Sequence, residues 1–147
     1  MSTSNILPRL VLLALVIMLA PSQAIAQKVI SWDELADLKI VENKATWEME
    51  FGPGVKKLAG KDIQINGFMM PLENTMKQKH FILSMVPLEG CQFCAPGTQS
   101  QFIEVKVSKG EGIEYTMQPI EVAGTLELLP DGPMGVFFLI KDARQAD

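Results

Sequence analysis

The sequence is poor in the residues that many enzymes need for catalysis. It has one histidine among 147 residues, and we expect that histidine to begin an extended segment, so a Ser/His/Asp catalytic set is not favoured. No glycine-rich loop precedes a predicted helix, which argues against a phosphate-binding loop. Acidic residues outnumber basic ones, 17 to 13, and the net charge of −4 makes nucleic acid a poor candidate for a partner.

The chain also lacks an apolar run long enough to cross a bilayer. The longest run, Leu10 to Ala20, is about half of the ~20 residues that a transmembrane helix needs. Arg9 precedes this run and an Ala-Ile-Ala sequence ends at residue 26, which is the pattern of a cleavable signal peptide. We therefore expect residues 1–26 to be removed on export to the periplasm. A single domain, residues 27–147, would remain outside the membrane.

The beginning of this domain predicts one short helix and one strand. Ser31 and Glu34 have the spacing of a capping box, which indicates a helix from about Trp32 to Leu38. The segment "TWEMEF" then alternates apolar and polar residues and ends at Gly-Pro-Gly, as a strand that leads into a turn would.

Five further segments alternate in the same way: "KDIQINGFMM", "HFILSMVP", "QFIEVKV", "PIEVAGTLEL" and "GVFFLIKD". Gly67 and Gly124 interrupt two of them, and at Gly67 we expect a bulge or a sharp bend. Five strands with glycines in mid-strand predict a mainly β fold, a small five-stranded antiparallel OB-like barrel with a short N-terminal helix. The residues expected in its core include Ile63, Ile65, Met69, Phe81, Leu83, Met85, Ile103, Val105, Val107, Ile120, Val122, Leu126 and Leu128.

Both cysteines, Cys91 and Cys94, lie in one C-x-x-C motif. Two thiolates at this spacing can form half of a tetrahedral zinc site, and they also suit copper(I). In an oxidising compartment the same pair can instead close a structural disulfide. A redox-active thiol is a third possibility, although Pro96 and Gly97 follow where a helix would be needed to lower the thiol pKa. The sequence leaves all three alternatives open.

His80 is the obvious third metal ligand, but its position argues against a site shared with the cysteines. If residues 80–86 are extended, His80 lies at the opposite end of the strand from the cysteine loop. A second cluster near His80 is conceivable, with Met69, Met70, Glu73 and Met76. Thioethers there would suit copper(I) and the carboxylate would suit zinc, whereas methionine more often fills a core.

The segments "GKDIQINGFMMPL", "HFILSMVP" and "CQFCAPGTQSQFIEVKV" together resemble the bacterial family of domain of unknown function 3299, small exported proteins. The resemblance runs from about Trp32 to Asp142. Its motif marks Gly67, Pro71, His80, Cys91, Cys94, Pro96 and Gly97. Ala95 follows the second cysteine, where methionine is expected in many relatives, a difference that would weaken a soft-metal site.

The resemblance implies a role beside zinc-responsive transport systems. From it we expect a non-enzymatic periplasmic accessory protein that handles zinc, or copper(I), through Cys91, Cys94 and His80, with a transporter or another periplasmic protein as partner. One alternative is an OB-like protein-binding module in which the cysteines form a structural disulfide. The other is a thiol–disulfide exchange protein.

Overall fold

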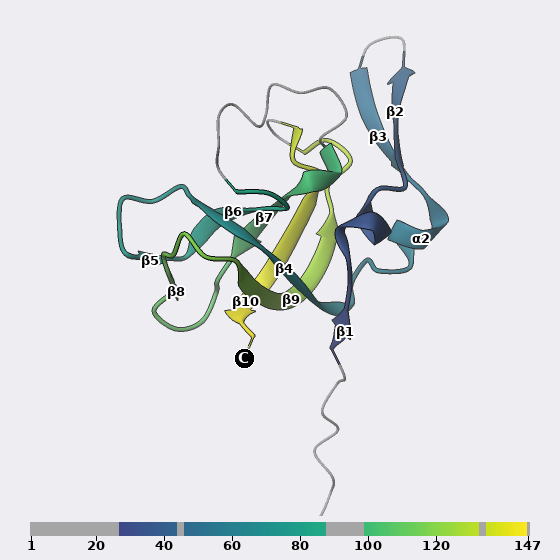
Figure 1. Cartoon of the computed structure of the whole chain (residues 1–147). Coiled ribbons are helices and arrows are strands. Elements are labelled where there is room, and N and C mark those ends of the chain that lie inside the picture. The colour runs from purple at the N-terminus through teal and green to yellow at the C-terminus, as the bar shows by residue number, and fades with distance from the viewer. Residues whose placement is uncertain (1–26, 44–45, 88–98, 133–134, 147) are drawn as a thin grey trace, which may run out of the picture.

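The computed structural model describes residues 27–43, 46–87, 99–132 and 135–146 (Figure 1). The described part is mainly β, as predicted, and none of its helices is long and apolar enough to cross a membrane. The elements are β1 (Lys28–Val29), the 3-10 helix η1 (Trp32–Leu35), β2 (Leu38–Asn43), β3 (Thr46–Phe51), α2 (Pro53–Lys56), β4 (Asp62–Pro71), β5 (Lys77–Gln78), β6 (His80–Ser84), the 3-10 helix η3 (Gln99–Gln101), β7 (Phe102–Lys106), β8 (Ile113–Glu114), β9 (Ile120–Leu128) and β10 (Phe138–Gln145).

Five long strands close into a barrel in the order β4-β6-β7-β10-β9, and β9 pairs back to β4. This confirms the predicted small OB-like barrel, with one correction. The pairing of β7 with β10 is parallel, whereas we expected every pairing to be antiparallel. The reason is geometric, because strand directions cannot alternate all the way around a closed ring with an odd number of strands. β1 also pairs with β4, next to Ile63 and Gln64, and this is the second parallel pairing of the sheet.

β4 closes the barrel because it pairs with two strands in succession. Residues 62–67 pair with β9, and residues 68–71 pair with β6. Gly67 lies at this change of partner, where we expected a bend or a bulge. A Cβ atom there would lie 2.8 Å from both the Ser84 carbonyl oxygen and Leu83 Cγ. Glycine therefore lets β4 approach β6 closely at the point where the barrel turns.

The second mid-strand glycine faces a bulge in the neighbouring strand. The register of β10 against β9 shifts between Lys141 and Arg144, and Asp142 within that interval has a φ of 52°. A Cβ atom on Gly124 would lie 2.6 Å from Ile140 Cγ2 and 2.7 Å from the Lys141 carbonyl oxygen. The missing side chain at Gly124 thus makes room for the bulged backbone of β10.

The barrel interior contains the alternating apolar residues of all five strands. Most of the predicted core residues are buried, but Met85 is 40% exposed, because β6 ends at Ser84 and the alternation ends with it. The fully buried apolar side chains of the barrel strands include Ile63, Phe81, Leu83, Ile103, Val105, Val122, Leu126, Phe138 and Ile140.

The region before the barrel differs from its prediction in length and content. The expected helix is a single 3-10 turn, Trp32–Leu35, in which the Ser31 N–H donates to Glu34 Oε2 at 3.4 Å. β2 begins at Leu38 and pairs with β3 as an antiparallel hairpin, which the sequence did not predict. The hairpin projects from the barrel beside α2 (Figure 1).

Candidate functional site

The two cysteines lie outside the described residues. β6 ends at Ser84 and β7 begins at Phe102, and the chain between these strands carries both Cys91 and Cys94. The expectation of a metal site, a disulfide or a reactive thiol there stays a prediction. His80, at the start of β6, is the described member of the predicted set of ligands.

The imidazole of His80 is held by a carboxylate on the neighbouring strand. His80 Nε2 lies 2.7 Å from Glu104 Oε1, and Lys106 Nζ lies 2.8 Å from the same oxygen. The register of β6 against β7 explains this contact. His80 is opposite Lys106, and Glu104 lies two residues before Lys106, on the same outer face of β7. The His80 side chain is 41% exposed, whereas that of Glu104 is 13% exposed. The carboxylate therefore fixes the orientation of an accessible ring.

The charge of Glu104 is favoured by its two partners. Burial alone raises the pKa of the Glu104 carboxyl. Hydrogen bonds from Lys106 and His80 lower it by more than burial raises it, so the pKa lies below its ordinary value. The ionised carboxylate is accordingly the form that the strands β6 and β7 hold in place.

Glu73 also lies close to His80, but its carboxylate binds the backbone. Glu73 Oε2 accepts hydrogen bonds from the N–H groups of Lys79, at 2.7 Å, and of His80, at 3.3 Å. The fully buried Gln78 side chain fixes the same loop, since its amide accepts from the Glu73 N–H and donates to the Glu73 carbonyl. Glu73 thus shapes the β4–β6 connection.

The methionines do not gather around His80 as the copper(I) alternative requires. Met69 is buried in the barrel core, Met70 packs against the outer cluster of Ile82, Phe102 and Val136, and Met76 is exposed. Within the described ranges, no three histidine, cysteine, aspartate or glutamate side chains lie close enough together to hold a metal ion. Met69 thus fills the core, which is the alternative that the sequence favoured for these methionines, and a metal at His80 would need ligands from elsewhere.

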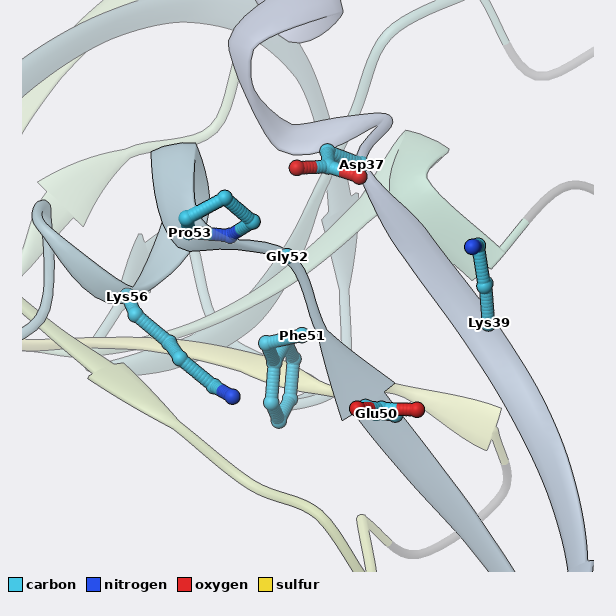
Figure 2. A pocket seen from close by; sticks show the side chains of 7 residues that line it. All are labelled: Asp37, Lys39, Glu50, Phe51, Gly52, Pro53 and Lys56. Carbon is cyan, nitrogen blue, oxygen red and sulfur yellow. The ribbon is translucent and has the colours of Figure 1, made fainter.

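A second candidate site, which was not predicted from the sequence, lies at the base of the hairpin. A pocket of about 230 Å³ opens between β2, β3 and α2, with the apolar ring of Phe51 in its wall and Asp37, Lys39, Glu50 and Lys56 around it (Figure 2). These residues were missed because the hairpin itself was missed. The alternating segment "TWEMEF" was visible in the sequence, but its partner strand was not.

Together the barrel and its outer face define a class of protein, the small OB-like β-barrel domain. Such barrels use the face of their second and third strands, together with neighbouring loops, to bind other molecules. Here those strands are β6 and β7, which carry the His80–Glu104 pair.

The chain belongs to the family described as "Protein of unknown function (DUF3299)", whose profile matches residues 17–131. The crystal structure of a DUF3299 family protein from Pseudomonas aeruginosa PAO1 is similar in fold, with a TM-score of 0.56 and 18% sequence identity. The similarity covers 83% of this chain and 97% of the other. No curated protein matched the chain.

Proposed function

We propose that the protein is a non-enzymatic periplasmic accessory protein, exported by the signal peptide of residues 1–26, that handles zinc or copper(I) for a transport system. The observation that supports this proposal best is the His80–Glu104 contact of 2.7 Å. Histidines that bind metals usually donate their other ring N–H to a carboxylate, a backbone carbonyl or water, which fixes the tautomer and orients the ring. With Nε2 on Glu104, Nδ1 has no hydrogen-bond partner among the described residues and is the nitrogen available for a metal.

The C-x-x-C motif supplies the second part of the proposal. Cys91 and Cys94 provide two soft ligands, and His80 provides one nitrogen at the other end of β6. Two incomplete ligand sets, each completed by water, a carboxylate or a partner chain, suit a protein that passes a metal on. A storage site would instead need a closed set of four ligands.

The test is a thiol count and metal analysis of protein isolated from the periplasm without reducing agents. We expect free thiols with zinc or copper bound, loss of most of this metal in the Cys91→Ser/Cys94→Ser double variant, and weaker zinc binding in His80→Ala. Wild-type protein with no free thiol and no metal would overturn the proposal. Lys109→Ala is the control, because it changes an exposed residue outside both ligand sets. Gln78→Ala would not serve, because the Gln78 side chain is fully buried and its loss could disturb the fold.

A second candidate function is an OB-like protein-binding module with Cys91 and Cys94 as a structural disulfide. It is favoured by the position of His80, Glu104 and Lys106 on the face that OB folds use for binding. The same thiol count separates the two candidates, since the binding module predicts no free thiol and no bound metal. A thiol–disulfide exchange role requires in addition a depressed thiol pKa, which alkylation rates measured against pH would detect.

A further inference from the structure

The pocket at the base of the hairpin has charges of both signs around it, and we call it the hairpin groove. Lys39 on β2 and Glu50 on β3 are opposite each other in the strand register, Asp37 precedes β2, and Lys56 ends α2. Figure 2 shows the four charged side chains in alternating order around the ring of Phe51. The groove therefore has no net charge, which is unfavourable for a free anion, a polyanion or a metal cation.

The four charges are available to a partner. None of Asp37, Lys39, Glu50 and Lys56 forms an ion pair within the part of the chain that the structure describes. Opposite charges that face each other across a hairpin usually pair, at least loosely. Here Lys39 and Glu50 remain apart, so each can pair with a group that enters the groove.

An apolar extension continues from the charged pocket. An adjoining cavity of about 360 Å³ shares Glu50, Phe51 and Lys56 with it and adds Val41, Met49 and Pro130 to its lining. Val41 is 43% exposed, so its side chain is accessible to a ligand. The groove thus offers an apolar surface directly beside positive and negative charges that are unpaired within the described ranges.

The floor of the groove is fixed to the barrel. The rings of Phe51 and Phe138 meet edge to face, with centroids 5.8 Å apart. The Met49 N–H donates to the Pro130 carbonyl, next to β9, at 3.2 Å. Within the hairpin region itself, the Gly52 N–H donates to the Asp37 carbonyl at 2.7 Å. Because these contacts exist before any ligand arrives, binding would cost little ordering of the backbone.

The charged side chains around the groove are exposed to solvent, and this exposure favours an extended polypeptide over a small molecule as the ligand. A site for a small molecule usually buries 70–90% of its ligand, roughly, in a concave cavity. Asp37, Lys39, Glu50 and Lys56 are all exposed, so they would leave such a ligand largely in water. An extended polypeptide, which spans both parts of the groove, would contact the charges and the apolar lining at once.

We propose that the hairpin groove docks an extended segment of a partner polypeptide in which an apolar residue stands between one acidic and one basic side chain. The apolar residue enters the cavity beside Met49 and Val41, and the flanking charges pair with Lys39 and Glu50. This docking is independent of the proposed metal handling, because the groove contains none of the predicted metal ligands.

The test uses four blocked tripeptides added to the isotope-labelled, exported protein, with the backbone amide signals followed by NMR. The mixed peptides are acetyl-Lys-Leu-Glu-amide and acetyl-Glu-Leu-Lys-amide. The like-charged controls are acetyl-Lys-Leu-Lys-amide and acetyl-Glu-Leu-Glu-amide. We expect at least one mixed peptide to shift the amides of β2, β3 and α2, and to bind about fivefold or more tightly than either control, since exposed ion pairs contribute modestly.

Charge variants locate the response. Lys39→Glu should weaken binding of the preferred mixed peptide about fivefold. The double variant Lys39→Glu/Glu50→Lys, which exchanges the two charges, should instead prefer the mixed peptide of the opposite order. Lys109→Glu makes the same charge change between β7 and β8, away from the hairpin in Figure 1, and should leave binding unchanged.

Three outcomes would overturn the proposal. The first is the absence of amide shifts with all four peptides, and the second is an equal response to mixed and like-charged peptides. The third is an equally strong response to free L-leucine, which would indicate a site for a small zwitterion. Each outcome is independent of whether the protein binds zinc, so failure here and failure of metal handling can be distinguished.

Discussion

The barrel and the hairpin unit, which we define as residues 37–58, differ in how they use charged side chains. On the barrel surface each of three acidic residues pairs with a basic residue: Glu104 with Lys106 of its own strand, Glu127 with Lys141 of the neighbouring strand, and Asp62 with Arg144 across β9. In the hairpin unit, Lys39 and Glu50 face each other without pairing. Because exposed pairs add little stability, the difference concerns which charges are free to meet a partner.

The two regions also differ in what holds them together. The barrel strands bury complete side chains against each other, whereas the hairpin buries Met49 and Phe51 against the barrel and leaves Lys39, Val41 and Glu50 exposed. The hairpin thus depends on the barrel for its stability. We expect the barrel to depend on the hairpin much less, and this asymmetry can be tested.

Phe138→Ala should give the largest effect, because the ring is fully buried in the barrel and also contacts Phe51. We expect the free energy of unfolding, measured with urea, to fall by about 3–5 kcal/mol. Met49→Ala should lower the free energy of unfolding by about 2 kcal/mol. It should also speed amide hydrogen exchange in β2 and β3 while leaving exchange in β4 and β9 unchanged. Equal loss of protection in the barrel strands after Met49→Ala would show that the two regions unfold as one.

Alanine in place of glycine sharpens the same comparison. At Gly124 the new Cβ would lie 2.7 Å from the backbone oxygen of Lys141, which cannot move alone, and we expect a loss of about 1–3 kcal/mol. At Gly52 the new Cβ would meet the Asp37 carboxylate, an exposed side chain that can rotate away, so the loss should stay below about 1 kcal/mol. Urea denaturation of both variants measures the difference, and similar losses would contradict this account.

The barrel could be predicted from the sequence because each of its strands carries its own signal. Alternation indicated that Ile63, Ile103 and Val122 face the core, and the mid-strand glycines Gly67 and Gly124 favoured a barrel. The hairpin could not be predicted in this way. Lys44 and Ala45 separate β2 from β3 in the sequence, and neither is the glycine or asparagine that typically signals a tight hairpin.

The candidate sites depend on strand register, which a single sequence does not contain. The contact of Glu104 with His80 requires the exact pairing of β6 with β7 across a long connection. Likewise, Lys39 and Glu50 become neighbours only through the hairpin register. The sequence could therefore identify His80 as a candidate ligand without identifying the carboxylate that orients it.

The smallest effect that we predict compares a paired carboxylate with an unpaired one. Glu104→Gln removes the charge that Lys106 and His80 hold, and we expect a loss of about 1 kcal/mol at neutral pH. Glu50→Gln should cost less than about 0.5 kcal/mol, because its carboxylate forms no ion pair among the described residues. Urea denaturation of the two variants and the wild type provides the measurement.

The pH dependence identifies the cause of the Glu104 effect. Folding lowers the pKa of Glu104 below its ordinary value of 4.5, so its contribution to stability is complete above that pH and is lost as the pH falls through the lower, folded pKa. The gap between wild type and Glu104→Gln should therefore narrow in acid. If this difference in the free energy of unfolding stays constant from neutral pH to about pH 3, the loss does not come from the charge of Glu104, because protonation would then leave it unchanged. Disturbed packing by the glutamine would be the cause instead.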